Sequence, residues 1–143
     1  MRCVDVNVLV YAHRPESQRH EEFRGWLDAA RAADEPLGIA DIVLSGFIRV
    51  VTHPRVFREP TPLPVAQAFV EALRTAPGSR MLTAGERHWA IFRDLCTATG
   101  ATGNRVPDAY LAALAIENGA TWITADRGFA RFPRLRWAHP LQS

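Results

Sequence analysis

Lysine is missing from this 143-residue sequence, and its 17 basic residues are all arginine. Cysteine is scarce: Cys3 and Cys96 have the spacing of neither a disulfide framework nor a metal-binding pair, so we expect two reduced core residues. No apolar run reaches the length of a membrane span, and the first residues show no signal-peptide pattern. These absences argue against a secreted or membrane protein, and we expect a cytoplasmic one.

Motifs of several enzyme classes are also missing. The sequence has no glycine-rich phosphate loop and no convincing Ser-His-Asp order. Its histidines do not pair at metal-ligand spacing with each other or with a cysteine, so we expect structural or solvated roles for them. They are His13, His20, His53, His88 and His139. The chemistry of this chain therefore has to come from other residue types.

The sequence does contain enough apolar material for a core, with 48% hydrophobic residues. Its length fits a single domain over residues 1–143. We expect strands at residues 2–6, 37–40, 81–82, 121–124 and 135–137, and helices at 7–13, 17–33, 42–52, 65–75, 84–98 and 107–118. This alternation predicts an α/β fold of three layers, in which helices flank a mostly parallel central sheet.

The first apolar run contains one acid, Asp5. Residues 2–6 have the continuous apolar character of a strand buried inside a parallel sheet, where a carboxylate is costly unless a cation or hydrogen bonds meet it. Asp5 lies where this strand should end and a helix should begin. Because ligands of α/β sheets bind outside the carboxyl ends of the strands, Asp5 is either the N-cap of that helix or a metal ligand.

Two further acids lie at comparable positions. Asp108 is in the first turn of the predicted helix 107–118, and its neighbours on the same face are apolar, so it should point over the sheet. Glu117 is roughly half a turn out of phase and should face solvent. Asp126 comes just after the predicted strand 121–124. Taken singly, Asp108 also fits a helix-dipole role and Asp126 a turn.

Asp5, Asp108 and Asp126 would repel one another at one sheet edge unless a cation lay among them. Hard ions such as Mg²⁺ and Mn²⁺ take oxygen ligands and bind phosphates, and such sites hydrolyse phosphodiester bonds. The three acids are therefore candidate metal ligands and catalytic residues. Asn7 and Asn104 could support them through hydrogen bonds, although both also fit helix-start and loop positions.

Arginine is concentrated near the C-terminus, where no acid follows Asp126. This stretch is either a solvated tail or a patch that binds the phosphates of a nucleic acid. Its members are Arg127, Arg131, Arg134 and Arg136, and Arg49 and Arg55 are further candidates.

Four motifs follow one another along the chain. They are residues 4–9 (VDVNVL), 47–57 (FIRVVTHPRVF), 103–104 with 107–113 (GN and PDAYLAA), and 124–129 (TADRGF). In this order and spacing, essentially the whole chain resembles the PIN-domain ribonucleases of the VapC toxin family. The resemblance implies a metal-dependent endoribonuclease that cleaves RNA, a cognate antitoxin protein that blocks the site, and a homodimer. It also implies that Asp5, Asp108 and Asp126 bind the metal, Mg²⁺ or Mn²⁺.

One position departs from the family pattern: Gly46 stands where a glutamate is usual, and neither Ser45 nor Asp41 matches it. Since glycine inside a helix costs about 1 kcal/mol relative to alanine, either the backbone needs room there or a ligand position is vacant. The alternative function is then a weakly active or inactive PIN protein that binds RNA or its antitoxin. A receiver-like phospho-acceptor also gathers acids at a sheet edge, but it uses a lysine that this chain lacks.

Overall fold

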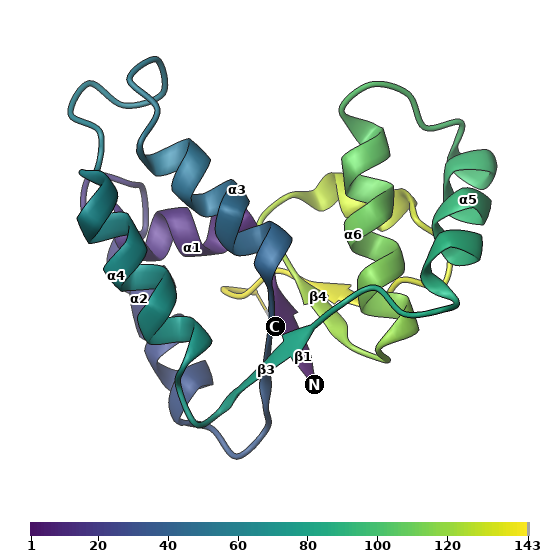
Figure 1. The fold of residues 1–143 in the computed structure, drawn as a ribbon, viewed down its shortest axis with the longest axis horizontal. Coiled ribbons are helices and arrows are strands. Elements are labelled where there is room, and N and C mark those ends of the chain that lie inside the picture. The colour runs from purple at the N-terminus through teal and green to yellow at the C-terminus, as the bar shows by residue number, and fades with distance from the viewer. Residues whose placement is uncertain (143) are drawn as a thin grey trace.

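A parallel sheet of five strands runs through the molecule in the computed structural model, which describes residues 1–142 (Figure 1). The strands are β1 (Arg2–Val4), β2 (Leu37–Ala40), β3 (Ser79–Leu82), β4 (Thr121–Ile123) and β5 (Trp137–Ala138). Their order is β3-β2-β1-β4-β5, and each pairing is parallel. The central place of β1 agrees with its continuous apolar sequence.

Helices cover both faces of this sheet. They are α1 (Val6–His13), α2 (His20–Ala32), α3 (Asp41–Val51), α4 (Leu63–Arg74), α5 (His88–Thr99) and α6 (Arg105–Glu117), with the short 3-10 helix η1 (Arg127–Arg131) after β4. Figure 1 shows α1 to α4 on one side of the strands and α5 with α6 on the other. The predicted three-layer α/β fold is confirmed. Within residues 1–142, no helix combines the length and the apolar character needed to cross a membrane.

Aromatic and aliphatic side chains fill the spaces between the sheet and its helices. The largest fully buried side chains are those of Trp122, Phe47 and Phe129, which come from β4, α3 and η1. Cys3 is buried, Cys96 is half-buried, and both are free thiols, as expected. Burial, helped by the nearby Asp5 carboxylate, raises the pKa of the Cys3 thiol to about 12, which keeps it protonated and unreactive.

The first strand is shorter than predicted because the candidate site residue Asp5 caps the helix that follows it. β1 ends at Val4 rather than at residue 6. The Asp5 carboxylate accepts a hydrogen bond from the Val6 backbone N–H at 2.7 Å, and this cap starts α1 at once.

Glu117 explains why α5 begins later than predicted. Its carboxylate accepts hydrogen bonds from the backbone N–H groups of Gly85 and Arg87, at 2.7 and 2.9 Å, and so holds this segment as a turn. For this reason α5 begins at His88 and not at residue 84. Glu117 does not line the cleft and keeps part of its surface in solvent, as expected, although these contacts leave it half-buried. Other elements also begin two or three residues away from the predicted positions: α2 at His20, α4 at Leu63, β3 at Ser79, α6 at Arg105 and β5 at Trp137.

Candidate functional site

Asp5, Asp108 and Asp126 line one cleft of about 460 Å³, beyond the edge of the sheet where β1 and β4 end. β1 and β4 are parallel neighbours, so the residues that follow them come close together. Asp108 reaches the same cleft from the first turn of α6. The structure thus brings together all three acids that the sequence singled out. Other lining residues include Asn7, Tyr11, Gly46, Arg49 and Phe57.

Asp5 is the most buried of the three acids, with only 6% of its surface exposed. Its Oδ1 accepts the hydrogen bond from Val6, and its Oδ2 accepts from the Thr124 hydroxyl at 2.7 Å and from the Asn7 amide at 3.2 Å. Burial raises the pKa of Asp5 to about 6; the two hydrogen bonds from Thr124 and Val6 oppose this rise, and the other two acids add to it. Asp5 therefore caps α1 and also lines the cleft, and its role as a metal ligand stays a prediction.

A hydrogen-bond network joins the two strand ends. Asn7 donates to the Thr124 hydroxyl at 3.2 Å as well as to Asp5, and its side-chain oxygen accepts from the Ala125 N–H at 3.0 Å. The fully buried Thr124 hydroxyl also accepts from the Asp126 N–H at 3.0 Å. Asn7 supports the site as the sequence suggested. Thr124 was missed, although its place two residues before Asp126 was the signal that could have found it.

The other two positions discussed from the sequence lie differently. Asn104 is the exposed N-cap residue of α6, makes no side-chain capping bond, and does not line the cleft, so its expected support of the acids is not seen in residues 1–142. Gly46 does line the cleft, on the wall that α3 contributes. A Cβ at this position would meet Val6 Cγ2 at 3.1 Å, so the space beside it is narrow but not closed.

Asp108 and Asp126 share one cation, the guanidinium of Arg105. Its Nη1 lies 3.1 Å from Asp108 Oδ2 and 3.8 Å from Asp126 Oδ2. Burial raises the pKa of Asp108; Arg105 opposes this rise and Asp126 adds to it. Asp126 also accepts the Gly128 N–H at 2.8 Å and thereby starts η1, so its turn role holds beside its place in the cleft.

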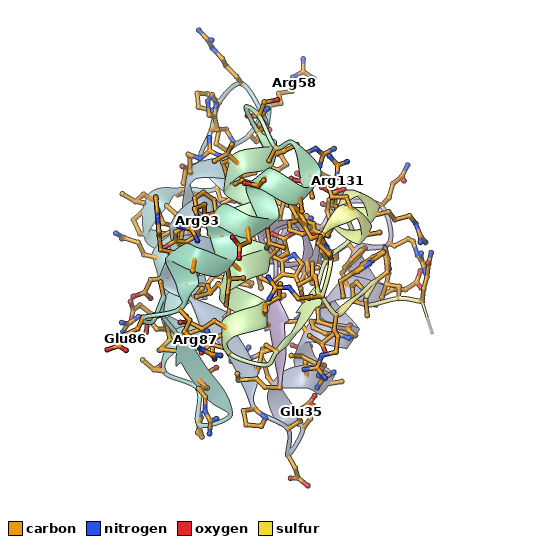
Figure 2. All side chains as sticks on the ribbon, turned by 90° about the vertical axis from the view of Figure 1, so that its right-hand side faces the viewer. Glu35, Arg58, Glu86, Arg87, Arg93 and Arg131 are labelled. Carbon is orange, nitrogen blue, oxygen red and sulfur yellow. The ribbon has the colours of Figure 1, made fainter. Side chains whose placement is uncertain are left out.

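Of the candidate phosphate-binding arginines, one lines the cleft and the C-terminal four are exposed outside its lining. Arg49 lines the cleft itself, whereas Arg127, Arg131, Arg134 and Arg136 are exposed on η1 and the following segment. Figure 2 shows Arg131 and Arg58 toward the end of the molecule that lies opposite Glu35. Several of these side chains also hold backbone or side-chain oxygens: Arg131 binds Gly128 O, Arg136 binds Gly119 O, and Arg127 binds Gln142 Oε1.

Comparison with known proteins decides the family. A family model described as the PIN domain matches residues 2–135. The chain is 58% identical to Ribonuclease VapC43 of Mycobacterium tuberculosis over 141 residues, which are 99% of this chain and 96% of that protein. This chain belongs to the PIN-domain family of VapC ribonucleases. Ribonuclease VapC25 of the same organism is 39% identical to this PIN domain over 140 residues, 98% of this chain and 99% of the relative.

Solved structures confirm the fold of this PIN domain. VapBC2 from Rickettsia felis, solved bound to a DNA fragment from its promoter, superposes with a TM-score of 0.71 at 18% identity, covering 96% of both chains. VapC20 of Mycobacterium tuberculosis, described as a toxin that cleaves the sarcin-ricin loop, superposes with a TM-score of 0.66 at 16% identity, covering 95% of this chain and 99% of that one.

The acids of this PIN domain suit a hard divalent ion by their chemistry. Asp5 accepts three hydrogen bonds, which leaves one of its roughly four acceptor positions free. Within residues 1–142, no three Asp, Glu, His or Cys side chains are gathered closely enough to hold an ion as they stand. Mg²⁺ is usually bound through one or two carboxylates together with substrate phosphates and water, so a complete protein cage is not needed. The donor set therefore fits, with side-chain movement at Asp108 and Asp126.

Proposed function

We propose that this PIN domain is an endoribonuclease that hydrolyses phosphodiester bonds in RNA with Mg²⁺ or Mn²⁺, and that it is the toxin of a toxin–antitoxin pair. The observation that carries the proposal is the gathering of Asp5, Asp108 and Asp126 around one cleft beside an arginine, Arg49. The ribonuclease names of its relatives support it. An RNA substrate and free thiols also fit an action in the cytoplasm.

In this proposal Asp5, Asp108 and Asp126 are the metal ligands and the catalytic residues. A bound divalent ion lowers the pKa of a water molecule and stabilises the developing charge on a phosphate. Asp5 is the fixed member, because Val6, Thr124 and Asn7 orient both of its oxygens. Asp108 and Asp126 have exposed side-chain fractions of 23% and 43%, so they retain the freedom to close on an ion.

Arginine side chains would hold the RNA backbone. Arg49 lies in the cleft wall next to Gly46, and Arg131 projects from η1, the helix that Asp126 starts. A guanidinium presents a planar fork of donors that matches phosphate geometry. We expect affinity for RNA to fall steeply with salt, because each arginine–phosphate contact releases a counter-ion. Arg55, exposed on the loop after α3, could add another contact.

The partners in this proposal are a cognate antitoxin and a second copy of the chain. A groove of about 490 Å³ adjoins the cleft and shares Val6, Gly46, Arg49 and Leu111 with it. Ile42, with half of its surface exposed, and Val106 also line this groove, so a partner protein can bury apolar side chains beside the acids. The similarity to VapBC complexes supports an antitoxin. Inhibition of cleavage by the small protein encoded alongside tests the antitoxin, and light scattering tests the homodimer.

RNA cleavage by purified protein tests the activity. We expect cleavage with Mg²⁺ or Mn²⁺, no cleavage in chelator, and loss of cleavage in Asp5→Asn, Asp108→Asn and Asp126→Asn, with circular dichroism unchanged. Asp94→Asn is the matched control, because it removes an exposed carboxylate of α5 outside the cleft. Full activity in the three cleft variants would refute the site assignment.

One observation favours the alternative, a weakly active or inactive protein that binds RNA or its antitoxin. Gly46 leaves the α3 wall of the cleft without a carboxylate. Binding of RNA without metal-dependent cleavage, in the same assay, would support this alternative over the enzyme.

A further inference from the structure

Arg105 forms ion pairs with two acids of the cleft, Asp108 and Asp126. It is the first residue of α6, and its guanidinium Nη1 lies 3.1 Å from Asp108 Oδ2 and 3.8 Å from Asp126 Oδ2. The first contact is local, since the two residues are three apart on one helix. The second contact joins α6 to Asp126, the residue that caps η1.

Gly128 has no side chain and leaves space for the Arg105 guanidinium. A Cβ on Gly128 would lie 2.8 Å from Arg105 Nη1 and 2.9 Å from Asp126 Oδ1, so any larger residue would push one or both side chains away. Gly128 is not among the glycines with positive φ, which are Gly100, Gly103 and Gly119. The missing side chain at position 128 therefore leaves room for both groups in this arrangement, and a larger residue would displace the ends of these two flexible side chains.

Arg49, the arginine that lines the cleft, behaves differently. Among residues 1–142 it forms no ion pair with an acid. Arg105 can leave the acids by rotating its side chain, which is 40% exposed and has solvent to move into.

We infer that Arg105 is an internal counter-ion: its guanidinium bridges Asp108 and Asp126 in the metal-free protein, competes with the divalent ion for their Oδ2 atoms, and leaves them when the ion binds. This inference rests on the proposed function only in taking these acids as metal ligands. It accounts for the acids not being gathered into a cage, since two of them are held on the guanidinium.

The competition has two consequences. Metal binding has to break both ion pairs, so the natural protein binds Mn²⁺ more weakly than its carboxylates alone would. In the absence of metal, the same ion pairs reduce the repulsion between Asp108 and Asp126 and so stabilise the fold. Removal of the guanidinium should shift these two properties in opposite directions.

Mn²⁺ binding without RNA tests the inference, by electron paramagnetic resonance or calorimetry at about 0.15 M salt, where exposed charges more than about 8 Å apart are largely screened. Arg105→Gln keeps a good helix former at this position, and we expect it to bind Mn²⁺ about fivefold more tightly, the size expected for partly exposed ion pairs. Its melting temperature in chelator should fall, and Mn²⁺ should raise it by more than in the natural protein.

Arg131→Gln is the matched control. It removes one positive charge near the site, but Arg131 bonds the carbonyl of Gly128 and forms no ion pair with the acids within residues 1–142. Its Mn²⁺ affinity should change by less than about twofold. Arg105→Lys keeps the charge without the fork and should lie between the natural protein and Arg105→Gln.

Two results would overturn the inference. One is an unchanged or weaker Mn²⁺ affinity in Arg105→Gln; the other is an equal gain in Arg131→Gln, which would show a general charge effect. Neither result depends on RNA cleavage. If the natural protein binds Mn²⁺ and shows this competition but cuts no RNA, the proposed enzyme fails and the counter-ion role stands.

Discussion

Asp5→Asn in the metal-free protein gives a quantitative test of the site. The pKa of Asp5 rises from 3.8 to about 6 on folding, chiefly by burial, with the charges of Asp108 and Asp126 as further causes. A carboxyl group whose pKa is raised by folding stabilises the fold only while it is protonated. Its contribution is thus fully present below about pH 4 and is lost as the pH rises through about 6.

The size of this loss follows from linkage. Each unit of pKa difference is worth about 1.4 kcal/mol, so ionised Asp5 lowers the free energy of unfolding by about 3 kcal/mol at pH 7. Asparagine at position 5 cannot ionise, so this pH-dependent loss disappears. The substitution also places an amide where Asp5 Oδ2 accepts from Thr124 and Asn7, but that cost does not vary with pH.

The assay compares melting temperatures of the natural protein and Asp5→Asn from pH 4 to pH 8, in chelator and at constant ionic strength. We expect the melting temperature of Asp5→Asn, relative to the natural protein, to rise by about 10 °C between pH 4 and pH 7. Acids outside the cleft contribute equally to both proteins and cancel in the difference. Asp94→Asn, which removes an exposed acid, should show no such slope. If the difference in melting temperature between the two proteins does not change with pH, the interpretation of Asp5 as a buried carboxylate that destabilises the fold when ionised is refuted.

Three further outcomes follow from the same contacts. Gly46→Glu should bind Mn²⁺ more tightly, on the order of tenfold, and cut RNA faster, because the new carboxylate enters the cleft. The Val6 side chain has to move by a few tenths of an ångström to admit it. A Mn²⁺ titration and cleavage rates measure the two effects. Thr124→Val should lower the free energy of unfolding in urea by about 2 kcal/mol, because it leaves the Asp126 N–H without its acceptor and removes a donor to Asp5. Mn²⁺ should abolish the pH-dependent loss of stability caused by Asp5, because a bound ion favours the ionised carboxylate; melts with and without the ion measure this.

Each of these outcomes has its control. Gly46→Ala supplies a Cβ to α3 without a charge, so slower cutting in both variants would mean that position 46 needs room. Thr121→Val changes a threonine on β4 outside the network, and an equal loss there would argue against a special role of Thr124. If Mn²⁺ stabilises Asp5→Asn as strongly as the natural protein, Asp5 is not a ligand.

The sequence alone was sufficient for the fold and for the three acids. A continuous apolar run marks a strand buried on both faces, and alternating strands and helices favour a parallel sheet. Because parallel strands end at the same edge, acids placed after β1 and β4 had to come close together. Asp108 was readable as well, since helical periodicity turns its face toward the sheet.

Only the tertiary structure decided how these acids are held. The Thr124 hydroxyl lies 119 residues from Asp5 along the chain and 2.7 Å from it in space, a contact that no local pattern encodes. Arg105 and Asp108 are neighbours on one helix and could be paired by spacing, but the reach of the same guanidinium to Asp126 depends on how η1 packs beside α6. Local periodicity determines the face of an element on which a side chain lies. Distances between side chains from separate elements depend on how those elements pack. These distances set the charge balance of the site.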